Sequence, residues 1–358
     1  MSKIQVDESR MAEIGQDELR LAIEKLCAAA GLTTEDASIV ADAMILSHQR
    51  GVDTHGVRAL PNYIRRFRAG SLNPTPQLKL LRETEVSALV DADNALGHIA
   101  GHRAMQLAIQ KAKKSGIGMV AVRNSNHFGM TAYFSMLAQQ EGLIGFACTN
   151  AGARMAPTGG TTPCYGNDPW SFAFPYEDGG IPVVVDMANS VVANSNINIA
   201  KKLGTKIPTT WALTKEGEPT DDPHKAVLLQ PFGGYKGYAI SVVVEALTGA
   251  LAGAAFSKDT GALFSMEKGQ NLGHFFMALD VSLFASPEEF KARMADFCGA
   301  IKSSELAVNS KGVFLPGEIE ANRRSEQQQR GTFFIPREYV NDLNVLAEEL
   351  NADVRFAI

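Results

Sequence analysis

Cysteine is scarce in this sequence, and the scarcity excludes small folds that are stabilised by disulfides or by zinc. Only four cysteines occur among 358 residues, at Cys27, Cys148, Cys164 and Cys298, and no two of them form a Cys-x-x-Cys pair. Such scatter excludes a disulfide framework and a zinc knuckle. Because each cysteine has small or apolar neighbours, we expect buried free thiols.

Long apolar runs and an excess of positive charge are also missing. No run reaches the ~18 apolar residues of a membrane span, and the first residues, MSKIQVDESRMAEIGQ, hold no apolar core of a signal peptide. The net charge of -5 gives no basic surface for nucleic acid or anionic lipid. We therefore expect a cytoplasmic protein that binds neither nucleic acid nor membranes.

What is present is the composition of an ordinary globular protein. Hydrophobic residues make up 45% of the chain and charged residues 20%, which is enough for a sizeable core and two to three domains. Apolar periodicity alternates between strand and helix, which predicts a mixed α/β fold, that is, α/β or α+β layers around a sheet. Strands are predicted at 86–91, 119–123, 143–149, 183–186, 226–230 and 274–281, and helices at 17–30, 33–48, 57–67, 98–114, 130–140, 236–253, 287–302 and 337–350. Segment 71–77 is predicted to be a linker, and 158–168 and 322–332 to be mobile.

Three familiar motifs lack the neighbouring residues or elements that their function requires. Gly116-x-Gly118-x-x-Ala121 has the spacing of a dinucleotide fingerprint, but it lies between a helix and a strand instead of following a strand, so an ordinary Rossmann domain is rejected. His98 and His102 have metal-ligand spacing without the glutamate of a zinc protease, and we expect no metal. No G-x-S-x-G elbow accompanies Ser47, which disfavours a hydrolase with a serine nucleophile.

The stretch from Ser47 to Phe67 is the leading candidate for the chemistry. Gly51 and Asp53 interrupt a helix, so His55 is expected at a corner between two helices, with Arg58 on the same side of the next turn. An imidazole can exchange a proton at cell pH, and a guanidinium can bind a carboxylate through two parallel hydrogen bonds. The alternative is that His55 caps the corner; for the arginines after Pro61, a solvated face is the favoured interpretation.

Further candidates follow later in the chain. Residues 124–129, Asn-Ser-Asn-His-Phe-Gly, come directly after a predicted strand, where His127 is either a second proton carrier or a helix cap. Lys236 stands between glycines at the start of a helix and suits a phosphate. The turn 316–318 could close over a ligand.

Taken in order, these motifs resemble the type 2 malate/lactate dehydrogenase family over roughly residues 15–345. In chain order they are D-T-H-G-V (53–57), L-P-x-Y (60–63), N-S-N-H-F-G (124–129), D-M-A (186–188), G-G-Y-K-G (233–237) and P-G-E (316–318). The resemblance implies a non-Rossmann fold in a homodimer. It divides the chain into a helical domain (1–70 plus 331–358), a substrate-side α/β domain (71–126 plus 295–330) and a separate mixed-sheet NAD(P)-binding domain (127–294).

The resemblance also implies the site. His55 and His127 would be catalytic, His55 as proton donor or acceptor at the substrate oxygen and His127 against the nicotinamide, where some members use it as proton acceptor. The residues expected at the substrate are Thr54, Arg58, Tyr63 and Asn167. The residues expected at the cofactor, NAD or NADP, are His127, Phe128, Gly129, Asp186, Met187, Ala188, Lys236, Gly237, Pro316, Gly317 and Glu318.

The expected reaction is hydride transfer between NAD(P) and a small 2-hydroxy or 2-oxo acid. Reduction of a cyclic imino acid and oxidation of a ureidoglycolate-type substrate are alternatives within the family. A metal-dependent hydrolase that uses His98 and His102, and a non-catalytic metabolite-binding protein, are the alternatives from other classes.

Overall fold

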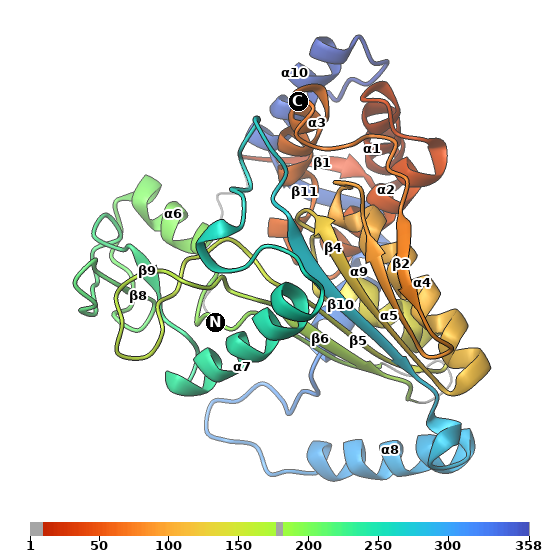
Figure 1. Ribbon diagram of the computed structural model, residues 1–358. Helices are drawn as coiled ribbons and strands as arrows, with labels where there is room; N and C mark the ends of the chain where they lie inside the picture. Colours follow the sequence, from red (N-terminus) through yellow and green to blue (C-terminus); the bar gives the residue numbers. More distant parts are fainter. Residues whose placement is uncertain (1–9, 177–181, 358) are drawn as a thin grey trace.

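A seven-stranded mixed sheet forms the centre of the molecule (Figure 1). The structure, a computed structural model, describes residues 10–176 and 182–357. The strand order is β2-β3-β4-β10-β5-β6-β7; β3 and β4 are parallel, and all other neighbours are antiparallel. The bounds are β2 Lys79–Glu83, β3 Ser87–Asp91, β4 Ile117–Ser125, β5 Ile144–Thr149, β6 Trp170–Phe174, β7 Val183–Met187 and β10 Leu272–Leu279.

Two helices, α4 (Gly97–Ser115) and α5 (Thr131–Gln140), cover one face of this sheet. α4 presents small buried residues such as Ala104 and Ala108, which let its backbone come close to β4. At Gly118 the approach is so close that a Cβ atom would lie 2.0 Å from the carbonyl oxygen of Ala108. Gly116, with φ 83°, ends α4. The two glycines of the fingerprint therefore serve helix termination and packing, and they lie between a helix and a strand, as predicted.

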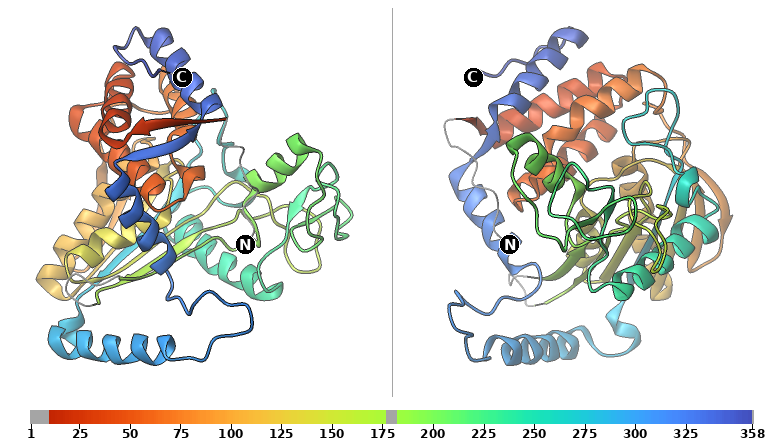
Figure 2. Two further views of the ribbon diagram at one scale, coloured as in Figure 1. Left: turned by 180° about the vertical axis from the view of Figure 1, so that it is seen from behind. Right: turned by 90° about the vertical axis from the view of Figure 1, so that its left-hand side faces the viewer.

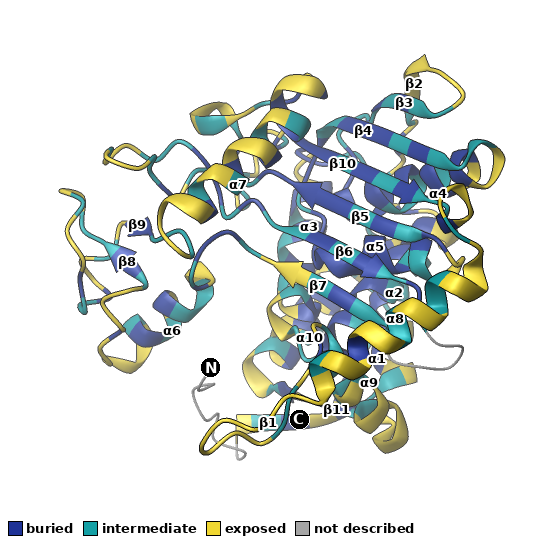
Figure 3. Ribbon diagram, turned by 90° about the horizontal axis from the view of Figure 1, so that it is seen from below, coloured by how far each residue is buried: buried dark blue, intermediate teal, exposed yellow. Residues whose placement is uncertain are grey.

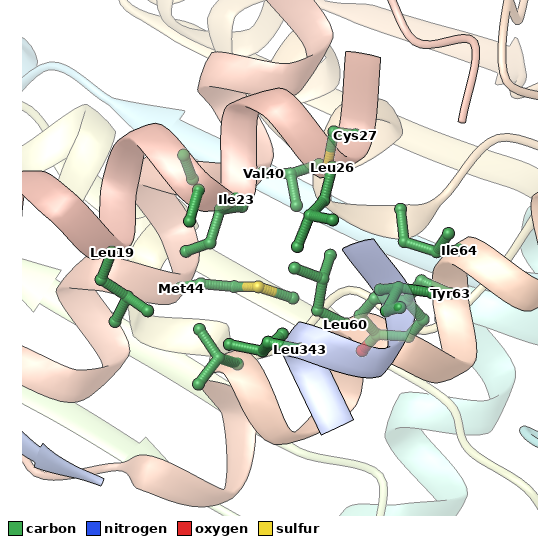
Figure 4. Close-up of a cluster of buried hydrophobic side chains, with 14 of the residues drawn as sticks. Leu19, Ile23, Leu26, Cys27, Val40, Met44, Leu60, Tyr63, Ile64 and Leu343 are labelled. Carbon is green, nitrogen blue, oxygen red and sulfur yellow. The ribbon is translucent and has the colours of Figure 1, made fainter. Parts of the chain in front are cut away.

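The two ends of the chain meet in a helical unit beside the sheet. It contains α1 (Gln16–Ala29), α2 (Thr34–Gln49), α3 (Leu60–Arg68) and α10 (Arg337–Leu350), together with strands β1 (Met11–Gly15) and β11 (Thr332–Pro336), which pair antiparallel (Figure 2). Figure 4 shows its core, where leucine, isoleucine and methionine side chains of α1 and α2 meet α3 and Leu343 of α10. Segments from both ends of the chain therefore share one hydrophobic core, while the bounds of the predicted helical domain stay a prediction.

The remaining elements surround the carboxyl ends of the central strands or extend from the body. They are α6 (Asn194–Leu203), β8 (Ala212–Leu213), β9 (Leu228–Leu229), α7 (Tyr235–Glu245), a π-helical turn (Ala246–Leu251), α8 (Pro287–Lys302) and α9 (Glu318–Arg330). α8 lies far from the helical unit, and most of its surface is exposed (Figures 1 and 3). Among the described residues, no helix combines the length and apolarity needed to cross a membrane.

Several local predictions differ from the structure. Strands β1, β2, β6, β8 and β11 were not predicted, and the strand expected at 226–230 shrinks to Leu228–Leu229. The segment 322–332, predicted to be mobile, lies mostly in α9. The helix expected at 236–253 changes from α-helical to π-helical pairing after Glu245.

The predicted border at residue 126 falls within one continuous sheet. Strands β3 and β4 come from the range assigned to the substrate side, and β5, β6, β7 and β10 come from the range assigned to the cofactor. The first nine residues of the predicted helical domain lie outside the described residues. The mixed α/β class is confirmed, while the three-domain division stays a prediction.

Candidate functional site

The corner that carries His55 is built around a neighbouring histidine, His48. Its Nδ1 lies 3.0 Å from Oδ1 of Asp53, and its Nε2 accepts the backbone N–H of Val57 at 3.1 Å. A Cβ atom at Gly56 would lie 2.2 Å from the same ring nitrogen, so only glycine fits there. The imidazole of His48 thus ties α2 to both sides of the turn. The role of His48 was not predicted, and the only sequence signal for it is its position five residues before Asp53.

His55 and His127 lie side by side with parallel rings. Their centroids are 5.8 Å apart, and the angle between the ring planes is 3°. His55 lies in the short 3₁₀ turn Asp53–His55 after α2, whereas His127 follows the end of β4. The tertiary structure therefore brings together the two imidazoles that were predicted separately, and it places the space in front of His127 within reach of His55.

Each imidazole has a polar partner at Nδ1. Thr54 Oγ1 lies 3.1 Å from Nδ1 of His55. The hydroxyl oxygen of Tyr63, on α3, lies 2.6 Å from Nδ1 of His127. Among the described residues, none hydrogen-bonds to Nε2 of either ring. This second nitrogen of each imidazole is therefore the atom that can exchange a proton with a substrate.

Burial keeps both imidazoles neutral. Desolvation lowers the pKa of His55 to about 4. It also lowers the pKa of His127 well below the ordinary value, and the neighbouring His55, His98 and His274 and the cation Arg66 lower it further. Burial raises the pKa of the Tyr63 phenol, so its hydroxyl stays protonated. A neutral imidazole can accept a proton at Nε2 while its Nδ1–H donates to the tyrosine oxygen.

The predicted cofactor residues gather around the end of β7. Asp186 lies there, and its Oδ2 accepts the backbone N–H of Ala132 at 3.2 Å, at the first turn of α5. Burial raises the pKa of this carboxyl group to about 6. Because Ala132 follows His127 by five residues, this bond connects the Asp186–Ala188 segment to the stretch that carries His127.

A glycine turn leads from this segment into α7. The N–H of Phe232 donates to the carbonyl of Asn189 at 2.9 Å, and the N–H of Gly237 donates to the carbonyl of Phe232 at 3.0 Å. A Cβ atom at Gly237 would lie 2.6 Å from that same carbonyl oxygen. Lys236 is exposed at the start of α7, where the N–H groups of Lys236 and Tyr238 donate to the carbonyls of Gly233 and Gly234 and the helix dipole has its positive end.

The turn 316–318 lies on the edge of β7. The N–H of Val184 donates to the carbonyl of Pro316 at 3.0 Å, and Gly317 has φ 83°. The Glu318 carboxylate is already engaged, since Lys302 Nζ and the N–H of Leu315 donate to it at 2.7 and 2.8 Å. The glycine turn is therefore close to the Asp186 segment, but the carboxylate of Glu318 serves the loop and helix around it.

Three of the predicted site residues have side chains engaged by other parts of the protein. Arg58 lies over the ring of Tyr339, 5.8 Å from its centroid, and so is directed to α10 rather than to His55. Phe128 is buried in the core, stacked on His274 with centroids 4.7 Å apart, so its side chain does not face a ligand. Tyr63 bonds to His127 instead of presenting a free hydroxyl.

Asn167 lies beside the predicted cofactor segment and is held there through its backbone. Its carbonyl accepts the N–H of Asn189 at 2.7 Å, next to the Asp186–Ala188 segment. Gly129, with φ 76°, is another close approach, because a Cβ atom there would lie 2.4 Å from Nε2 of His98. Met187 is exposed at the end of β7.

The interpretation of the arginines after Pro61 is wrong for one of them. Arg65 and Arg68 face outward and pair with Glu349 of α10. Arg66, by contrast, has no exposed surface. The signal that could have found it is its spacing, because Arg66 follows the buried Tyr63 by three residues and so shares its face of α3.

The two histidines with metal-ligand spacing have other environments. His98 is fully buried beside Gly129, and His102 Nδ1 lies 2.8 Å from the hydroxyl of Tyr133. In the part of the chain that the structure describes, no group of three His, Cys, Asp or Glu side chains could hold a metal ion.

Comparison with known proteins gives similarity over nearly the whole chain. A family model described as malate/L-lactate dehydrogenase matches residues 14–344. A malate dehydrogenase of Pyrococcus abyssi is 38% identical over 323 residues, covering 87% of this chain and 88% of that protein. An L-sulfolactate dehydrogenase of Methanocaldococcus jannaschii is 36% identical over 326 residues, covering 90% and 93%. The solved structure of malate dehydrogenase from Entamoeba histolytica matches with a TM-score of 0.91 at 30% identity, covering 97% of this chain and 100% of that one.

Proposed function

The chain belongs to the malate/L-lactate dehydrogenase family, and on that premise we propose that it transfers a hydride between NAD or NADP and a small 2-hydroxy or 2-oxo acid. It is an oxidoreductase of the dehydrogenase class. The observation that carries the proposal is the parallel pair His55 and His127, while Ala132, five residues after His127, bonds to Asp186 of the predicted cofactor segment. Malate-like and lactate-like acids are the proposed substrates.

The residues around β7 and α7 fit a dinucleotide. Gly233 and Gly234, with φ 57° and 63°, turn the chain so that α7 begins beside the exposed Lys236. The positive end of a helix dipole together with an exposed lysine suits phosphate oxygens. We assign the phosphates to Lys236 and Gly237, and the nicotinamide end to Asp186–Ala188 and His127.

The proton step falls to His127 in this proposal. Bound NAD or NADP would supply the hydride acceptor for oxidation, or the hydride donor for reduction, at the carbon that carries the substrate oxygen. Nε2 of His127 accepts the hydroxyl proton as the carbonyl forms, and the Nδ1–H then donates to Tyr63. A tyrosine hydroxyl both donates and accepts, so it fits the ring before and after protonation. His55, oriented by Thr54, lies beside this ring and positions the substrate oxygen.

A panel of substrates tests the function directly. The full-length protein is incubated with 2-oxo acids, a cyclic imino acid and ureidoglycolate-related compounds, each with NADH and with NADPH or with the oxidised cofactors. Consumption or formation of reduced nicotinamide is followed by its near-ultraviolet absorbance. Turnover of a 2-oxo acid supports the proposal. A protein that binds such an acid without any change in absorbance would be a metabolite-binding protein, and activity abolished by a chelator would indicate a metal-dependent enzyme.

Replacing Tyr63 with phenylalanine should slow turnover without loosening cofactor binding. The substitution removes one hydrogen bond from Nδ1 of His127, worth about 0.5–1.5 kcal/mol, so kcat should fall roughly 2- to 10-fold. Tyr133→Phe is the matched control, because that hydroxyl bonds to His102 instead. Equal kcat values for Tyr63→Phe and the wild type would remove Tyr63 from the proton step.

Replacing Lys236 with alanine should weaken cofactor binding. A charge-assisted phosphate contact is worth about 1.5–3 kcal/mol, so the cofactor Kd should rise roughly tenfold or more. Titration of protein fluorescence with NADH and NADPH gives both constants. Lys225→Ala, at another exposed lysine, is the control. If both variants keep the wild-type Kd, the phosphates lie elsewhere.

We also propose that the working unit is a homodimer that covers apolar surface on α7 and around α8. Val243 and Leu251 in and after α7 are 58% and 61% exposed, and Phe284, Phe297 and Val308 around α8 are 80%, 60% and 91% exposed. Clusters of large apolar side chains with this much exposure are typical of subunit contacts. Phe297→Glu should shift the mass measured by light scattering from dimer toward monomer, while Lys291→Glu, on the same helix, should not. A monomeric wild-type protein would contradict this proposal.

A further inference from the structure

Arg66 is a fully buried cation without a carboxylate partner among the described residues. Its guanidinium donates to four neutral acceptors: Asn126 Oδ1 at 2.9 Å, Ser71 Oγ at 3.3 Å, Gln270 Oε1 at 3.4 Å and the carbonyl of Lys268 at 3.5 Å. Burial of an unpaired charge is costly, and an apolar residue at this position would avoid that cost. A structural role alone therefore gives little reason for a guanidinium here.

The acceptors of Arg66 are the groups that hold the backbone at His127. Asn126 immediately precedes His127, and its Oδ1 also accepts the N–H of Gln270 at 2.8 Å. Oε1 of Gln270 in turn accepts the N–H of His127 at 2.9 Å. The guanidinium therefore bridges two amide side chains, one in the residue before His127 and one bonded to the peptide N–H of His127.

The same network joins three parts of the fold. Arg66 comes from α3, Asn126 follows β4, and Gln270 ends the loop that precedes β10. Nδ2 of Asn126 donates to the carbonyl of Ala95, just before α4, at 2.9 Å. Tyr63, one turn before Arg66 on α3, holds the other side of His127 at Nδ1. One helix thus supports His127 both through its ring and through its backbone.

We propose that Arg66 is a positioning residue for His127, which it holds through the Asn126–Gln270 amide pair. This inference rests on the proposed function, in which His127 carries the proton. Arg66 does not touch the substrate, because it has no exposed surface. It also acts by charge: the cation is one of the groups that lower the pKa of His127, together with His55, His98 and His274, and burial is the largest cause.

The test compares Arg66→Met with Arg66→Lys and with Gln270→Ala. The fold should survive Arg66→Met, because Asn126 Oδ1 and Gln270 Oε1 each retain a backbone N–H donor. In Arg66→Met, kcat should fall roughly 10- to 100-fold, the range expected when a catalytic group moves by up to ~1 Å. The KM for the acid should change little, and the acid limb of the pH profile should move to higher pH. Arg66→Lys should restore the position of the pH profile while kcat stays below that of the wild type.

Arg65→Met is the matched control, because Arg65 is exposed on the same helix and pairs with Glu349. Its kinetics should match those of the wild type. Gln270→Ala keeps the charge but removes the acceptor of the His127 N–H, so it should lower kcat without moving the pH profile. If Arg66→Met is unfolded at the assay temperature, Gln270→Ala provides the test instead. Unchanged kcat together with unchanged NMR signals of the His127 ring in Gln270→Ala then overturns the inference.

Titration of the histidine ring signals by NMR gives a measurement that does not depend on turnover. The His127 signal, assigned by its loss in His127→Gln, should titrate at higher pH in Arg66→Met than in the wild type. An unchanged titration together with unchanged kcat in folded Arg66→Met overturns the inference. If the wild type turns over no acid on the panel, the proposed function fails, yet the ring titration still reports whether Arg66 holds His127.

Discussion

His127→Ala is expected to lower kcat by about 10²- to 10⁴-fold, the usual contribution of a general acid or base. The substitution removes the imidazole that hydrogen-bonds to the Tyr63 hydroxyl and lies parallel to the ring of His55. Cofactor Kd should change far less than kcat, because the phosphates are assigned to the start of α7. Steady-state kinetics and fluorescence titration separate these two quantities.

The pH dependence of the same reaction gives a second measurement. In the oxidation direction the base must be neutral, and burial lowers the pKa of His127 well below the ordinary value. The neutral form is therefore present at lower pH than for a free imidazole of pKa ~6.5, and kcat/KM should stay on its plateau well below that pH.

His55→Ala is the comparison that distinguishes the two imidazoles. Nδ1 of His55 lies beside the hydroxyl of the exposed Thr54, whereas Nδ1 of His127 bonds to the buried Tyr63. We therefore expect the loss of His55 to raise KM more than it lowers kcat. If His55→Ala loses kcat by the larger factor while His127→Ala does not, the assignment of the proton step is reversed.

Gly97→Ala is expected to reduce both stability and activity. Gly97 begins α4, where alanine would ordinarily favour the helix by ~1 kcal/mol. Here a Cβ atom would lie 2.1 Å from the carbonyl oxygen of Asn126, 2.6 Å from Cβ of Phe128 and 2.8 Å from the carbonyl carbon of His127. The N–H of Gly97 also donates to the carbonyl of His127 at 3.2 Å. Because backbone atoms on the opposite side must move, overpacking should outweigh helix propensity and cost about 1–3 kcal/mol or more.

The activity loss has the same cause. The displaced atoms belong to the stretch that carries His127, and a shift of about 1 Å at a catalytic group costs on the order of 10²-fold in rate. Gly299→Ala is the matched control, because it lies within α8 and a Cβ atom there has no neighbour within 4 Å. The melting temperature and kcat should both fall for Gly97→Ala. For Gly299→Ala, kcat should stay level and the melting temperature should stay level or rise slightly. A Gly97→Ala protein with wild-type melting temperature and kcat would show that α4 and the His127 stretch are not in contact.

Local signals in the sequence were sufficient for much of the fold. The apolar periodicity of α1, α2, α4, α5, α8 and α10 and of β3, β4, β5, β7 and β10 lies within each segment, so those elements could be predicted without their neighbours. The corner at His55 was also local, because Gly51 and Asp53 break the helix in the sequence itself. β1 and β11 were missed for the opposite reason, since Met11 pairs with Pro336 at the other end of the chain.

The sequence by itself determined the class of fold, the two imidazoles and the glycine turns, because glycine, proline and helical spacing act over a few residues. Only the tertiary structure decided their partners. Tyr63 reaches a ring 64 residues away, and Arg66 is bound by amides 60 and 204 residues away. A guanidinium in the sequence is most simply solvated, and it can be buried only when the folded chain supplies the acceptors that replace water.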